Sequence, residues 1–135
     1  MENKYYFDGV LASYIAIRLE PIVNGNFSGI ELEILEKIYA SFHNAGKTIS
    51  IEKIAEIEGL PESSVKYVVN SLSQKGLIKP GSDWQTTKEG DKVIDEAKKI
   101  YKESKEYLQS DKLMSTVITV SGTKIEFWVD YYFFF

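Results

Sequence analysis

Cysteine is absent from the 135-residue chain, which excludes disulfides, thiolate metal sites and cysteine nucleophiles. The single histidine, His43, removes most histidine-dependent metal and triad chemistry. Glycines are isolated, so no glycine-rich loop is present to cradle a phosphate. Glu31, Glu33 and Glu36 crowd one predicted helix, where we expect a solvated surface. These patterns predict a protein that is not an enzyme and holds neither a metal nor a cofactor.

Long apolar runs are also missing. No run approaches the roughly 18 residues that a membrane helix needs, and the N-terminal MENKYYFDG lacks a signal-peptide pattern. Hydrophobic residues make up 44% of the chain and charged residues 27%, which is ordinary for a globular domain with a core. We therefore expect a cytoplasmic protein that makes no membrane contact.

Arginine is nearly absent, because Arg18 is the only one among 16 basic residues. Arginine is the usual bidentate reader of guanine, so any nucleic-acid contact would rely on lysine, small polar side chains and backbone amides. The net charge is −4. Residues 1–46 carry 3 basic and 6 acidic groups, whereas residues 47–110 carry 11 of each. A binding face is therefore expected to be local and central.

The N-terminal half shows three helix patterns. Residues 4–19 favour a helix that ends before Pro21, with a short strand as the alternative. Ser28 and Glu31 have the spacing of a capping box, which predicts a helix that ends at Gly46. Ser50 is predicted to cap a short helix that reaches Glu58, and Gly59 occupies a left-handed C-terminal position.

The second half continues with a predicted helix over 61–75 and a short two-stranded wing over 77–86. Thr87 is expected to cap a long helix that reaches about Leu108. A turn at Ser121-Gly122 and the alternating pattern over 124–133 then predict a C-terminal β-hairpin over 110–135. The order of these elements is that of a winged helix-turn-helix.

Residues 50–90 carry the motifs of a known family. They include Ile54-Ala55, the turn Gly59-Leu60-Pro61, the entry Ser63-Ser64-Val65 and the exit Lys75-Gly76-Leu77-Ile78. With Thr87…Gly90, this stretch resembles the MarR/PadR-like winged helix DNA-binding proteins, especially small ones from archaea and their viruses and plasmids. The resemblance covers residues 28–109 and implies a homodimeric transcriptional regulator.

The predicted fold class is accordingly α+β, mainly α: a winged helix-turn-helix with a long C-terminal helix and an added β-hairpin. Residues 1–27 would form an N-terminal extension and a candidate dimerisation element. Residues 28–109 would form the DNA-binding domain, and residues 110–135 the aromatic hairpin.

The predicted helix 61–75 supplies the candidate DNA-reading face. Its apolar side holds valines and Leu72, and its opposite arc has no acidic residue. Asn and Gln can pair with adenine edges, and Ser or Tyr can bind bases or phosphates. The expected double-stranded DNA contacts are Ser63, Ser64, Lys66, Tyr67, Asn70, Gln74, Lys47, Lys75, Lys79 and Ser82. The alternative is a solvated polar face that binds nothing.

The C-terminal end is unusually aromatic, with seven aromatic residues among positions 127–135. A soluble monomer rarely exposes so large an apolar patch, so we expect burial in a dimer. The candidate dimerisation residues are Tyr101, Leu108, Phe127, Val129, Tyr131 and Phe133. Two alternatives remain open: the hairpin covers the monomer's own core, or the chain is a protein-interaction module that binds a partner through these aromatic residues.

Overall fold

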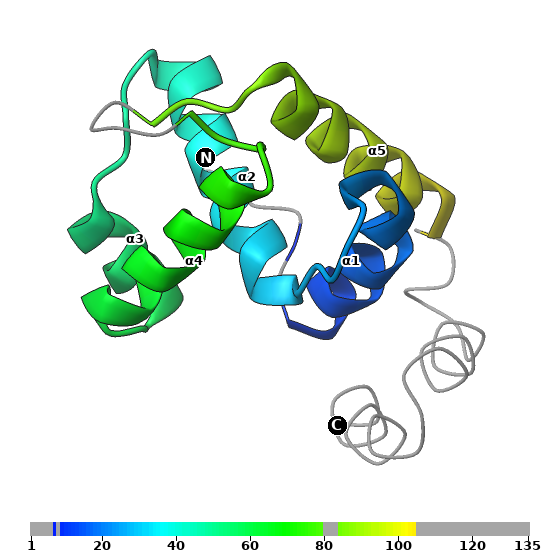
Figure 1. The fold of residues 1–135 in the computed structure, drawn as a ribbon, viewed down its shortest axis with the longest axis horizontal. Helices are drawn as coiled ribbons and strands as arrows, with labels where there is room; N and C mark the ends of the chain where they lie inside the picture. Colours follow the sequence, from blue (N-terminus) through cyan, green and yellow to red (C-terminus); the bar gives the residue numbers. More distant parts are fainter. Residues whose placement is uncertain (1–6, 8, 80–83, 105–135) are drawn as a thin grey trace. The chain divides into compact units, whose positions relative to one another are not determined.

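The computed structural model describes residues 7, 9–79 and 84–104, and this part of the chain is helical. The five helices are α1 (Gly9–Val23), α2 (Gly29–Ala45), α3 (Ile51–Glu58), α4 (Glu62–Gln74) and α5 (Lys88–Ser104) (Figure 1). Met1–Ala97 and Lys98–Phe135 form two compact units, and the first contains α1 to α4 with the first half of α5. None of the described helices has the length and apolar character needed to cross a membrane.

The predicted α+β winged helix-turn-helix is wrong. Where two wing strands were expected, the described residues form only one isolated antiparallel bridge, between Ile78 and Thr86. The Lys79 N–H donates to Gln85 O at 2.8 Å and the Thr87 N–H to Leu77 O at 3.0 Å. Within the described part of the chain no third strand lies beside these two short segments, so their pairing stops at a single bridge. The predicted hairpin over 110–135 lies outside the described residues.

Capping positions agree with the sequence in α2 and α3. The Ser28 hydroxyl accepts from the Glu31 N–H at 3.2 Å, and the Glu31 carboxylate accepts from the Ser28 N–H at 3.0 Å. This reciprocal pair confirms the predicted capping box. Ser50 caps α3 by accepting from the Lys53 N–H, and Gly59 ends α3 in the left-handed conformation.

The missing N–H of proline predicted that the first helix would end before Pro21. That prediction is wrong, because the helix continues past this residue. α1 runs from Gly9 to Val23 and contains Pro21 in its last turn. A proline removes one backbone donor, and the helix continues for only two residues beyond it. The chain then turns at Asn24, whose φ is 66°.

The core of the first unit is mainly aliphatic, with the aromatic side chains of Phe7, Tyr14 and Phe27 also buried. α1 packs against α2, and both α2 and α3 pack against α4. Gly29 lets α1 and α2 approach closely, since a Cβ there would lie 2.9 Å from the Ser13 backbone nitrogen. The fully buried large side chains of these helices include Ile15, Leu19, Leu32, Ile34, Leu35, Ile38, Ile54, Val65 and Leu72.

The carboxylates of α2 are not the solvated surface predicted from their spacing. Glu31 and Glu36 are buried and Glu33 is half-buried. The neighbouring Lys37 pairs with Glu58 of α3 at 2.9 Å, and both of these side chains are almost completely buried. A buried charge requires a partner, so the α2 surface is a packed charged contact. We call Glu33, Lys37 and Glu58 the α2–α3 charge cluster.

Within this cluster, Glu33 holds its proton unusually firmly. Burial, together with the hydrogen bond and negative charge of Glu58, raises the pKa of Glu33 to about 8. Lys37 and the Gly9 N–H, which donates to Glu33 at 3.2 Å, act in the opposite direction. Glu33 is therefore expected to be neutral at mildly acidic pH and to ionise as the pH rises towards 8.

This ionisation predicts a pH-dependent stability. The pKa of Glu33 rises from 4.5 to about 8 on folding. The contribution of protonated Glu33 to the free energy of unfolding is therefore complete below pH 4.5 and is lost as the pH rises through 8. Glu33→Gln should therefore raise Tm at pH 8 and leave it unchanged near pH 4.5. Because solvent screens a half-exposed group, we expect the substitution to raise the free energy of unfolding at pH 8 by about 1 kcal/mol, which corresponds to a rise in Tm of roughly 3 °C.

Thermal melts followed by circular dichroism at both pH values test this prediction. Glu89→Gln, at an exposed position of α5, is the matched control and should leave the pH profile unchanged. The prediction would be contradicted if both variants changed Tm equally, or if Glu33→Gln did not raise Tm at pH 8.

Candidate nucleic-acid interface

Helix α4 divides into a buried and an exposed face. Its valines Val65, Val68 and Val69 are buried together with Leu72. The opposite side carries the exposed ridge, which we define as Ser63, Tyr67, Asn70 and Gln74. Tyr67 is 76% exposed, an unusually open position for a large aromatic side chain. The ridge carries no acidic residue, although the chain as a whole has a net charge of −4.

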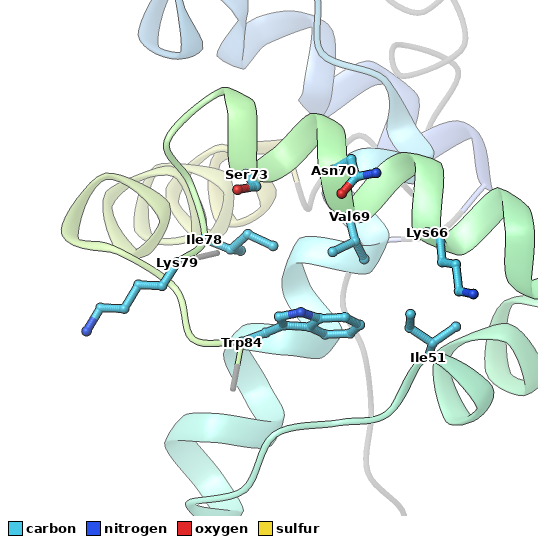
Figure 2. Close-up of a pocket in the computed structure, with 8 residues that line it drawn as sticks. All are labelled: Ile51, Lys66, Val69, Asn70, Ser73, Ile78, Lys79 and Trp84. Carbon is cyan, nitrogen blue, oxygen red and sulfur yellow. The ribbon is translucent and has the colours of Figure 1, made fainter. Parts of the chain in front are cut away.

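A cleft of about 240 Å³ runs along one side of the exposed ridge. Figure 2 shows Val69 pointing from α4 towards the indole ring of Trp84, with Lys66 and Lys79 at opposite ends. The lining residues are Ile51, Lys66, Val69, Asn70, Ser73, Ile78, Lys79 and Trp84. We call this the Trp84 cleft; among the described residues that line it, the charged ones are the two lysines.

A second hollow, of about 400 Å³, adjoins the Trp84 cleft. The two share Ile51, Lys66 and Trp84. The second hollow also contains Glu52 and Glu62, so its wall is acidic where that of the Trp84 cleft is basic. An anionic ligand would therefore favour the Trp84 cleft over its neighbour.

The opposite flank of α4 is held to α2. The Ser71 hydroxyl donates to Glu31 Oε2 at 2.7 Å, and the Lys75 ammonium pairs with the same oxygen. Burial disfavours the charged form of Glu31, but the hydrogen bonds from Lys75, Ser71 and Ser28 outweigh it and lower the pKa of Glu31. The charge of Lys75 is thus already balanced inside the protein.

The segment after α4 is fixed against the start of α5. The Thr87 hydroxyl donates to Gly76 O at 2.6 Å and accepts from the Gly90 N–H at 3.1 Å. This second bond confirms the predicted cap at Thr87. A Cβ at Gly90 would lie 2.1 Å from Leu77 O, so only glycine permits this approach. These contacts set the position of the Trp84 side of the cleft.

The structure gathers most of the predicted DNA contacts on one surface. Lys66, Tyr67, Asn70, Gln74 and Ser63 are exposed on α4, and Lys79 follows it at the rim of the cleft. Ser64 is half-buried, Lys47 is exposed in the connection after α2, and Lys75 faces Glu31. Ser82 lies outside the described residues.

Of the predicted dimerisation residues, only Tyr101 is described, half-buried on α5 in the second unit. Leu108, Phe127, Val129, Tyr131 and Phe133 lie outside the described residues.

Sequence reasoning missed several residues of the cleft. Ile51 and Ser73 line it although no sequence pattern singled them out, and Ile78 was named only as part of the family motif. Their convergence depends on how three segments pack. Trp84, which belongs to the predicted wing over 77–86, forms one wall of the cleft. An isolated tryptophan beside a predicted recognition helix was the one available signal.

No family model matches the chain, and no curated protein or solved structure matches it. Among the described residues, no group of three or more histidine, aspartate or glutamate side chains could hold a metal ion. His43, at the end of α2, lies 3.2 Å from an Asp91 carboxylate oxygen of α5. The exposed ridge and the Trp84 cleft together form the candidate binding surface.

Proposed function

We propose that this chain is a DNA-binding transcriptional regulator that inserts α4 into the major groove of double-stranded DNA. The observation that carries the proposal is the acid-free exposed ridge of α4, flanked by the lysines of the Trp84 cleft. The major groove of DNA is wide enough to admit an α-helix. Helices α3 and α4 are consecutive and joined by a short turn at Gly59, an arrangement that many major-groove readers share.

Charge favours one orientation on the duplex. Lys66 and Lys79 lie on the Trp84 side of α4, whereas Lys75 on the other flank is paired with Glu31. A phosphate strand would therefore pass over the Trp84 cleft and avoid the hollow that contains Glu52 and Glu62. The proposal assigns phosphate contact to Lys66 and Lys79 and base contact to the exposed ridge.

The proposed assembly is a homodimer, supported by the apolar residues at the ends of the sequence. Two copies of α4 about 34 Å apart would read a pseudo-palindromic site. Sedimentation of the chain with and without a bound duplex tests this assembly. A one-to-one complex would contradict the dimer and leave DNA binding unaffected.

Fluorescence anisotropy against a random double-stranded pool, titrated across salt, tests DNA binding. We expect the affinity to fall steeply as salt rises, since lysine contacts release counterions from the phosphates. Lys66→Gln/Lys79→Gln should reduce the slope of log affinity against log salt by about 2. Lys92→Gln, at an exposed position of α5, is the control and should leave the slope unchanged.

Absence of binding even at low salt would contradict this function. It would favour the alternative from the sequence, a protein-interaction module that uses the aromatic residues 127–135. Phe133→Ala would then be the variant to compare in partner binding.

A further inference from the structure

We propose that α4 reads adenine–thymine base pairs, with Asn70 and Gln74 as the adenine-reading side chains; this inference rests on the proposed DNA-binding function. Both side chains are exposed and belong to the same ridge. Gln74 is four positions beyond Asn70, so the two residues lie about 6 Å apart along the helix axis. This distance corresponds to roughly two base-pair steps of about 3.4 Å.

The chemistry of an amide matches the major-groove edge of adenine. Asparagine and glutamine each offer one carbonyl acceptor and an NH₂ donor. Adenine presents the N7 acceptor beside the N6 amino donor, so an amide can form two hydrogen bonds with it. Guanine presents two acceptors, N7 and O6, and the carbonyl of an amide finds no donor between them.

The residues that would read guanine are placed elsewhere. Arg18 is the only arginine of the chain and lies on α1, where its guanidinium donates to the Tyr14 hydroxyl at 3.0 Å. Lys66 and Lys79 line the Trp84 cleft beside the ridge, and Lys75 is held by Glu31. The ridge itself therefore offers amides and hydroxyls and no guanidinium or ammonium group.

The remaining large ridge residue suits the other base of the pair. Tyr67 lies between Ser63 and Asn70 on the ridge and is 76% exposed. Its ring can pack against the thymine C5-methyl group, an apolar contact that no other base offers in the major groove. Adenine and thymine are thus both recognised by the side chains that α4 presents.

The experiment compares affinities for three duplex pools of about 30 base pairs, containing random, A·T-only or G·C-only sequence, at one salt concentration. We expect A·T-only duplexes to bind more tightly than G·C-only duplexes, by about tenfold for each amide that pairs with adenine. Asn70→Ala and Gln74→Ala should each remove about tenfold of this preference. Asn44→Ala, an exposed asparagine of α2, should leave it unchanged.

Substituting 7-deazaadenine for adenine separates direct reading from DNA shape. This analogue lacks the N7 acceptor but keeps base pairing and backbone charge, so the A·T preference should fall for the unmodified protein and stay unchanged for Asn70→Ala/Gln74→Ala. Equal binding of all pools, a G·C preference, or an A·T preference that 7-deazaadenine does not reduce would overturn the adenine assignment alone. Failure to bind any duplex would overturn the proposed function as well.

Discussion

Replacing Lys37 by methionine is expected to lower the free energy of unfolding by about 3–5 kcal/mol at pH 8. Lys37 and Glu58 are 2.9 Å apart, with only 4% and 5% of their side chains exposed. Without the ammonium group, the buried Glu58 carboxylate would lose its cation and keep only the half-buried Glu33 beside it. Removing one partner of a buried pair costs far more than the net contribution of the pair, because the remaining charge is left uncompensated.

Urea denaturation followed by circular dichroism measures this loss. Lys53→Met is the matched control, because Lys53 pairs with Glu56 at 3.7 Å on the exposed surface of α3, and we expect a change below about 1 kcal/mol. The double variant Lys37→Met/Glu58→Leu should recover a large part of the stability, since both members of the buried ion pair are then replaced by apolar side chains. Equal losses for Lys37→Met and Lys53→Met would contradict the buried charge cluster.

The second large effect is expected for Gly90→Ala, which should lower the free energy of unfolding by about 3 kcal/mol. An alanine Cβ would lie 2.1 Å from Leu77 O and 3.3 Å from Thr86 Cβ. The oxygen belongs to the backbone on one side of the Ile78–Thr86 bridge, so it cannot rotate away as a flexible side chain would. Either α5 or the segment beside the Trp84 cleft must shift.

Gly25→Ala is the control for this prediction. Nothing lies within 4 Å of a Cβ at Gly25, and the φ of Gly25 is not positive. The free energy of unfolding of the Gly25→Ala variant should therefore stay within about 1 kcal/mol of that of the unmodified protein. Denaturation curves of the two variants, measured side by side, test the difference. A Gly90→Ala variant as stable as Gly25→Ala would show that the contact between Gly90 and Leu77 O is not close.

Local chemistry made α2, α3 and α4 predictable. Ser28, Ser50 and Gly59 act on backbone groups within a few residues, so their positions in the sequence already contain the interaction. The buried face of α4 followed from helical periodicity in the same way. The sequence also indicated that Ser63, Tyr67, Asn70 and Gln74 would share an exposed face, as they do.

Contacts between distant residues could not be inferred. Glu31 appeared to belong to a solvated surface because its partners Ser71 and Lys75 lie 40 and 44 residues further along the chain. The wing prediction was wrong for a related reason. The short segments at 77–79 and 84–86 indicate extended chain, but a sheet requires pairing beyond the single Ile78–Thr86 bridge. The spacing of residues within one helix gives no information on the distant partners of Glu31 or on the pairing of the two wing segments.

Helix α2 anchors both helices of the proposed reading unit. Glu31, in its first turn, holds the end of α4 through Ser71 and Lys75, and Lys37 holds the end of α3 through Glu58. Because both helices are attached by side-chain contacts to the same helix, α2, neither α3 nor α4 can easily reorient independently. Association with a duplex would then require little loss of conformational entropy from the protein, and adjustment to the groove would fall mainly to the DNA.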